Sequence, residues 1–177
     1  MDELAKIADL LKKRRQIDED LSRIIRRPAL PSHIGEFIAS KVFSIRLELS
    51  ATTKGVDGIF AEGPLKGNTV NIKMYGKQEG IMDITLVNLA DYYLVLTGPK
   101  SPPATSRGQS RPIVVSHVYL FKMTDLVNTL EKRGVKIGIA TSVRKSHWEE
   151  AEIYPNQRNR AIKLTEEQRK ALRLFSP

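Results

Sequence analysis

The chain has 177 residues, of which 41% are hydrophobic, and it contains no cysteine. This length suits one domain with a sizeable core and terminal extensions. Without cysteines, disulfides, thiolate zinc sites and cysteine nucleophiles are excluded, and the three histidines are widely separated, so we expect any metal to be bound by oxygen ligands. No apolar run approaches the roughly 20 residues of a membrane span, and the first residues lack a signal-peptide profile. We therefore expect a cytoplasmic protein with no membrane partner.

The net charge of +9 is densest in residues 156–177, where six Lys and Arg face two acids. Excess positive charge favours a polyanionic partner such as nucleic acid. A basic balance also serves solubility alone, so the charge does not decide the function.

Residues 2–27 contain no Gly or Pro and predict one long helix or two short ones. Their apolar residues form a heptad-like stripe, interrupted by Arg14 and Asp18, that comprises Leu4, Ile7, Leu11, Leu21 and Ile25. We treat residues 1–31 as an N-terminal helical extension. Its stripe either forms a homodimer contact or packs on the chain's own domain.

The next elements are a helix and a three-stranded unit. Pro28 and Pro31 end the first helix, and Ser32 can cap a second one from His33 to Phe43. Short β patterns follow at 45–49, 55–60 and 69–75, and the Gly, Pro and Asn residues of 62–68 predict a hairpin loop between the last two.

The second half of the chain alternates strands and helices. The patterns predict a short helix at 84–89, a strand buried on both faces at 92–97, an exposed loop at 98–112, a strand at 113–121, a helix at 123–132 and a strand at 135–140. Thr141 or Ser142 can cap a helix reaching Glu152. Residues 32–155 form the predicted α/β domain. In the basic tail, 156–177, a capping box at 165–168 opens a last helix that docks through Leu172 and Phe175.

The predicted hairpin brings polar residues together. If its loop is centred on Leu65, Asp57 pairs with Lys73, and strand alternation puts Asn71, Lys73 and Tyr75 on one polar face beside Asp57. Aspartate is uncommon in strands, and binding a cation is one reason for its presence. Together with Glu36 on the preceding helix, these residues provide what metal-assisted phosphodiester hydrolysis requires: oxygen ligands for Mg²⁺ and a lysine near the attacking water.

In this order and spacing, residues 32–97 resemble the PD-(D/E)XK, or restriction-endonuclease-like, nuclease superfamily. The stretches 35–39, 70–73 and 138–144 also resemble an uncharacterised prokaryotic domain family. The resemblance implies an α/β fold with a core of helix, three antiparallel strands, helix and strand, to which this chain adds further strands and helices.

The resemblance also implies roles for individual residues. Glu36 matches the family's helix glutamate, Asp57 its aspartate and Lys73 its lysine, so we expect Mg²⁺ or Mn²⁺ between Asp57 and Glu36. Asn71 stands where the family usually has Asp or Glu and is expected to act as a neutral ligand. Glu79 or Asp83 can supply the missing second acid from the segment that follows.

Basic residues outside this unit are candidates for nucleic-acid contact. Arg107 and Arg111 lie in the predicted exposed loop, and Arg144 and Lys145 lie at a predicted helix start, where an anion can bind. The first hypothesis is a magnesium-dependent endonuclease acting on DNA, the substrate that the resemblance favours. The second is a module of this fold that binds nucleic acid or a partner without cutting, and the third is a small-ligand binding domain.

Overall fold

The computed structural model describes residues 2–48, 55–101 and 112–177. Its helices are α1 (Glu3–Ile25), α2 (Pro31–Val42), α3 (Met123–Lys132), α4 (Lys145–Ala151) and α5 (Glu166–Arg173). Its strands are β1 (Ile45–Leu47), β2 (Gly58–Phe60), β3 (Thr69–Tyr75), β4 (Ile81–Met82), β5 (Tyr92–Thr97), β6 (His117–Lys122), β7 (Thr141–Ser142) and β8 (Glu152–Tyr154). The predicted α/β class is confirmed.

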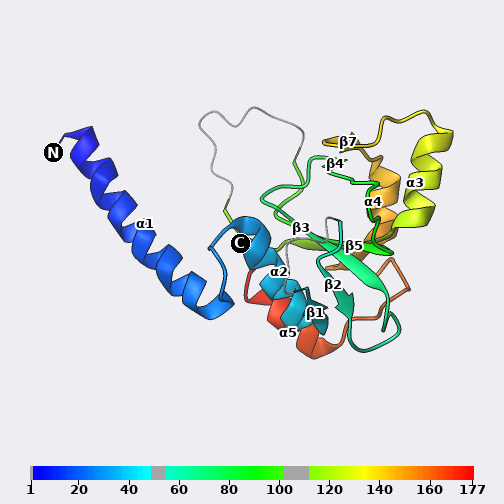
Figure 1. Cartoon of the computed structure of the whole chain (residues 1–177), viewed down its shortest axis with the longest axis horizontal. Helices are drawn as coiled ribbons and strands as arrows, with labels where there is room; N and C mark the ends of the chain where they lie inside the picture. The colour runs from blue at the N-terminus through cyan, green and yellow to red at the C-terminus, as the bar shows by residue number, and fades with distance from the viewer. Residues whose placement is uncertain (1, 49–54, 102–111) are drawn as a thin grey trace.

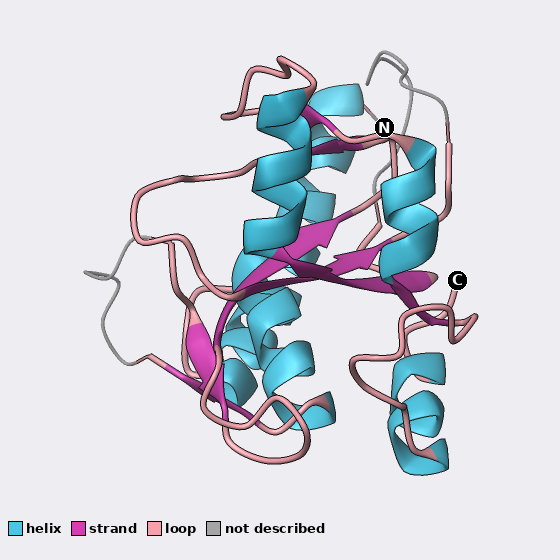
Figure 2. Cartoon of the chain, turned by 90° about the vertical axis from the view of Figure 1, so that its right-hand side faces the viewer, coloured by secondary structure: helices cyan, strands magenta, loops and turns pink. Residues whose placement is uncertain are grey.

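Six strands form the main sheet in the order β1-β2-β3-β5-β6-β8. Only β3 and β5 are parallel among its neighbouring strands, and the other pairs are antiparallel. Figure 2 shows this sheet as a middle layer with helices on both sides. The strands β4 and β7 form a separate antiparallel pair.

Side-chain alternation along β3, β5 and β6 produces two apolar cores, one on each face of the sheet. On one face Val70, Ile72, Leu94 and Leu96 pack with residues of α2 and with Leu172 of α5. On the other face Tyr93, Val95, Tyr119 and Phe121 pack with residues of α3 and α4. The face that carries Asn71 and Lys73 was expected to be polar, and this expectation is wrong because the second core covers much of it.

The helix α1 is continuous rather than split, and it extends away from the rest of the chain (Figure 1). It has no buried residue. Its side chains are linked along the helix by ion pairs, among them Asp9 with Lys13 at 2.8 Å and Asp20 with Arg23 at 2.7 Å. Among the described helices, α1 included, none combines the length and apolar composition that crossing a membrane requires.

Several predicted elements differ in the structure. Helix α2 begins at Pro31, with Leu30 as its N-cap and no side-chain cap, so the capping role expected for Ser32 is wrong. Residues 84–89 and 135–140 form neither a helix nor a strand. Instead, the Ile84 N–H donates to the carbonyl of Gly138 at 3.0 Å, and the positive φ of Asn88 and Ala140 breaks the repeat of either element.

Helix α4 also begins later than expected, with Arg144 as its N-cap. The Thr141 hydroxyl does not cap it, because this group exchanges hydrogen bonds with the backbone of Gly138 at 2.7 and 2.8 Å. The capping box of α5 is confirmed: Thr165 and Gln168 bond reciprocally. The Gln168 side chain also donates to the Val42 carbonyl at 2.9 Å, which ties α5 to the end of α2.

The loops that follow the parallel strands approach each other closely at Gly98. A Cβ atom at this position would lie 2.0 Å from the carbonyl oxygen of Gly76. The contact is between backbones, so a side chain can be accommodated only if the two loops separate. Gly98 thus holds the loop after β3 against the loop after β5.

We therefore predict that Gly98→Ala destabilises the fold by about 3 kcal/mol, the upper end of the usual cost of overpacking. The matched control is Gly138→Ala, because nothing lies within 4 Å of the Cβ position there. Urea unfolding measures both variants. Equal stability of the two variants would contradict the proposed close approach.

Candidate functional site

Glu36, Asp57 and Lys73 come from α2, from the residue just before β2 and from β3, and the structure brings them together. The electrostatic effects show this proximity. Burial raises the pKa of Glu36 above its ordinary value, and the neighbouring Asp57 charge raises it further. The pKa of Asp57 is also raised by burial, and the Lys73 charge lowers it in part. The two carboxyl groups and the ammonium group therefore form one local cluster.

The strand register differs from the expected one. The structure pairs Gly58 with Val70 and Ile59 with Thr69, so the hairpin is centred near residue 64 rather than on Leu65. The pairing of Asp57 with Lys73 is therefore wrong. The reason lies in the loop, where the N–H of Gly67 donates to the Phe60 carbonyl at 2.9 Å and shifts the closing pair.

Asp57 is instead bound to the middle of β3. Its backbone N–H donates to the Val70 carbonyl at 2.9 Å, and its carboxylate accepts the N–H of Ile72 at 2.6 Å. Asp57 directly precedes β2, and its side chain thus supplies the hydrogen bond to β3 that a neighbouring strand would otherwise make. The carboxylate is fixed between the backbone positions of Asn71 and Lys73.

Lys73 is oriented by an aromatic ring. Its Nζ lies 5.4 Å from the ring centroid of Tyr93, a distance typical of a cation–π contact. The Tyr93 hydroxyl accepts the N–H of Thr85 at 3.2 Å, so the ring is anchored at its far end. Burial raises the pKa of Tyr93, and the Asp57 charge adds to this rise, which places the phenol in the same cluster.

Asn71 is 6% exposed, and its Oδ1 atom has no hydrogen-bond partner among the described residues. An unpaired buried amide oxygen costs free energy unless a donor or cation binds it. The oxygen of Asn71 is therefore left to accept from a donor or to bind a cation.

Arg27 forms an ion pair with Glu36 that the sequence did not indicate. The contact lowers the pKa of Glu36 and opposes the effect of burial. Arg27 lies nine residues before Glu36, in the turn between α1 and α2, and no periodicity links the two positions. Only the fold of that turn reveals the contact.

Glu79 and Asp83 line a different pocket, of about 380 Å³, beyond the end of β3. Asp83 is engaged there, since its carboxylate accepts the N–H of Ala140 at 2.7 Å and its own N–H donates to the Tyr75 hydroxyl at 3.1 Å. The contacts described for Asp83 therefore hold it beside β7 and give no support to a role as second acid.

The remaining candidates are basic. Arg107 and Arg111 lie outside the described residues. Arg144 and Lys145 stand at the start of α4, where the Lys145 Nζ lies 3.6 Å from the Glu149 carboxylate.

The donors that this cluster offers to a hard cation are the carboxyl groups of Glu36 and Asp57 and the amide oxygen of Asn71. In the described ranges, no three His, Cys, Asp or Glu side chains are grouped so as to hold a metal ion. A site of two carboxylates and one amide oxygen would resemble the usual Mg²⁺ site, in which one or two carboxylates bind the ion and several waters or substrate phosphates complete its coordination.

Comparison with known proteins provides no family for the chain, because no family model matches it and no curated protein matches it.

The raised pKa of the half-buried Asp57 also affects stability. A folded-state pKa raised above the unfolded value contributes stability below the unfolded pKa, about 3.9 for Asp, and this contribution is lost as the pH rises through the folded value. At neutral pH the ionised Asp57 therefore destabilises the fold.

We predict that Asp57→Asn raises the melting temperature at pH 7 by a few degrees, since about 1 kcal/mol corresponds to roughly 2–4 °C at this chain length. The amide oxygen can still accept the Ile72 N–H. The gain should shrink toward pH 4, as measured by thermal unfolding in EDTA. Glu62→Gln, at an exposed loop position, is the control. A variant less stable than the parent at pH 7 would disprove the destabilising role of this charge.

Proposed function

We propose that the protein is a divalent-cation-dependent nuclease, which hydrolyses phosphodiester bonds with Glu36, Asp57, Asn71 and Lys73 as its active-site residues. The observation that supports this most is the pairing of the buried Glu36 with the half-buried Asp57, whose pKa values are both raised, and the position of Lys73 beside Asp57. Buried like charges are costly and cluster at functional sites. DNA is the favoured substrate, in keeping with the resemblance to restriction-endonuclease-like proteins.

The order of elements supports the same proposal. Helix α2 precedes the antiparallel strands β1, β2 and β3, and β5 then pairs parallel to β3. This is the order proposed for a restriction-endonuclease-like core, except that the segment between β3 and β5 contains β4 and no helix among the described residues. The crossover needed for a parallel pair is thus made by turns, the short strand β4 and irregular backbone.

Each residue has a chemical task in this proposal. Asp57, Glu36 and the Asn71 oxygen would hold Mg²⁺ or Mn²⁺, which when bound supplies Lewis acidity beside the scissile phosphate. The Lys73 ammonium, supported by Tyr93, would orient the attacking water and balance the negative charge that develops on the phosphate. Arg27 offsets the charge of Glu36.

We predict metal-dependent cleavage of plasmid or oligonucleotide DNA that falls by about a hundredfold or more in Asp57→Asn and in Lys73→Met. Lys66→Ala, an exposed position in the same hairpin, should keep the parent's activity. Mg²⁺ at a hundred times its Kd should also stabilise the parent by about 2.7 kcal/mol, but not Asp57→Asn. Cleavage that survives both active-site substitutions would exclude this site.

A non-cleaving module that binds nucleic acid is the second candidate. Two features favour it: Asn71 is neutral where the resemblance implies an acid, and the Arg27 guanidinium already forms an ion pair with the Glu36 carboxylate. This function predicts salt-sensitive DNA binding without cleavage, and binding that Asp57→Asn leaves unchanged.

We further propose that α1 pairs with α1 of a second copy. Its large apolar side chains are exposed, with Ile7, Leu10, Ile17 and Ile24 between 53% and 64% accessible. With Leu21 these residues follow a heptad spacing in which Arg14 occupies one core position. An antiparallel pair avoids placing Arg14 against its own copy and brings Lys13 near Asp20 of the second copy. Opposite charges at the edges of a coiled coil set its orientation.

We predict that the double substitution Leu10→Asp with Ile17→Asp converts a dimer into a monomer, as measured by sedimentation equilibrium. Lys12→Asp, on the outer face of the helix, is the matched control and should remain dimeric. A parent protein that is monomeric at high micromolar concentration would refute the pairing.

A further inference from the structure

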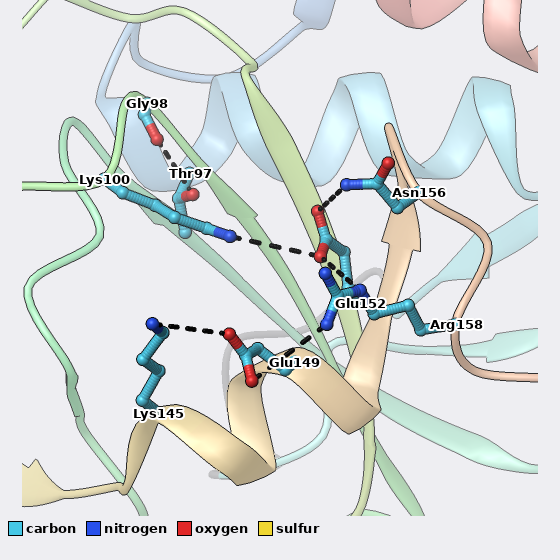
Figure 3. A network of polar contacts seen from close by, with 8 residues as sticks. All are labelled: Thr97, Gly98, Lys100, Lys145, Glu149, Glu152, Asn156 and Arg158. Atoms are coloured by element: carbon cyan, nitrogen blue, oxygen red, sulfur yellow. Dashed lines mark hydrogen bonds and ion pairs between the residues drawn. The ribbon is translucent and has the colours of Figure 1, made fainter.

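A second polar cluster lies at the other end of the sheet, around Glu152 of β8 (Figure 3). The Glu152 side chain is fully buried. One of its carboxylate oxygens accepts from Asn156 Nδ2 at 3.2 Å. The other lies 3.6 Å from Arg158 Nε and 4.0 Å from Lys100 Nζ. A buried carboxylate therefore faces two cationic groups at distances longer than a hydrogen bond.

The cluster continues onto α4 as a chain of alternating charges. Arg158 Nη1 lies 4.0 Å from one oxygen of Glu149, and Lys145 Nζ lies 3.6 Å from the other. Figure 3 shows these contacts in succession, from one charged group to the next: Lys145, Glu149, Arg158, Glu152 and Lys100. Both ends are lysines, so the cluster has one more positive group than negative groups.

The two terminal lysines line the same pocket, which has a volume of about 590 Å³. The side chains of Lys100 and Lys145 are 45% and 87% exposed, so their ammonium groups are accessible to solvent. Each lies farther from its carboxylate than the 2.7–2.9 Å typical of a charge-assisted hydrogen bond. Glu149 also lines the pocket, and its carboxylate is shared between Lys145 and Arg158. An anion that contacts both lysines would continue the alternation of charge.

The pocket stands beyond the carboxyl ends of the parallel strands β3 and β5. Gln78 forms a parallel bridge with Lys100, in which the Gln78 N–H donates to Pro99 at 3.1 Å and its carbonyl accepts from the N–H of Ser101 at 3.0 Å. These residues continue the ladder past the strand ends. In open sheets the space outside the carboxyl ends of parallel strands is the usual ligand site.

Neutral groups in the pocket lining can also donate. Trp148 is 2% exposed, and its Nε1 atom has no hydrogen-bond partner among the described residues. The same is true of Ser101 Oγ. An indole N–H is only a donor and a hydroxyl readily donates, so both favour a ligand rich in acceptor oxygens.

From these observations we propose that the pocket between Lys100 and Lys145 binds a phosphoryl group. A phosphate carries up to two negative charges and several acceptor oxygens at neutral pH, which suits a pocket lined by two lysines and by neutral donors. The phosphoryl group belongs either to a free nucleotide or to a polynucleotide. The proposal stands apart from the nuclease function, because it concerns different residues and needs no metal.

The chain contains a single tryptophan, and this residue lines the pocket, so its fluorescence reports binding there. We would titrate inorganic phosphate, a nucleoside monophosphate, and an oligonucleotide with and without a 5′-phosphate into the full-length Asp57→Asn variant in EDTA. Sodium chloride at matched ionic strength is the reference. We expect a saturable change with the phosphate-bearing probes and none with chloride.

Lys100→Gln and Lys145→Gln should each weaken phosphate binding about tenfold or more, since each removes a charge-assisted contact. Lys163→Gln, an exposed lysine of the C-terminal tail, should bind like the parent. Circular dichroism verifies that the three lysine variants fold.

Tighter binding of the oligonucleotide than of the mononucleotide identifies a polynucleotide as the source of the phosphoryl group, and the reverse identifies a free nucleotide. Absence of a saturable response, or unchanged phosphate binding by a variant that combines Lys100→Gln with Lys145→Gln, overturns the proposal even if the nuclease function holds.

Discussion

The parallel pairing of β3 with β5 is the constraint on which the rest of the structure depends. Six residue pairs run from Val70 with Tyr92 to Tyr75 with Thr97. This ladder sets the alternation that sends Val70 and Ile72 into one core and Asn71 and Lys73 to the opposite face. It also brings the two carboxyl ends to the same edge, where Gly98 packs against Gly76. Both candidate sites are attached to this one pair of strands.

The carboxylates of the two sites differ in the charged groups that surround them. At the first, Asp57 is held by the Ile72 N–H and Glu36 by Arg27, yet burial still raises both pKa values and so opposes ionisation of either carboxyl group. At the second, Glu152 has Lys100 and Arg158 on the same oxygen. The first cluster sets the cationic groups of Arg27 and Lys73 against two carboxyl groups, whereas the second has three cationic groups for two carboxylates.

Sequence patterns predicted the elements whose periodicity extends over many residues. The strands at 69–75 and 92–97 and the helix at 123–132 have the expected bounds, because their apolar repeats decide burial on their own. The short segments 84–89 and 135–140 were wrong, since their few residues are shaped by contacts with each other, such as the bond between Ile84 and Gly138. The secondary-structure propensity of a short segment gives no information about such tertiary contacts.

The candidate site shows the same limit. Asp57, Lys73 and Glu36 could be named from their types and order, but their geometry could not, because hairpin symmetry gives a register only when the loop is symmetric. Here the bond from Gly67 to Phe60 shifts it. The Arg27 contact and the Glu152 cluster join residues far apart in sequence with no shared period. Only the tertiary arrangement brings them together.

The spacing of the two sites follows from their common strand. Lys73 and Gln78 are five residues apart on β3 and its continuation, so their Cα atoms lie at most about 18 Å apart. A nucleic acid strand advances about 3.4 Å per nucleotide, so this distance corresponds to about five nucleotides. If both proposals hold, one polynucleotide would be long enough to contact both sites, and a phosphate bound between Lys100 and Lys145 would fix the register of the strand at Lys73. A free nucleotide is too short to do so, and in that case the two sites act independently.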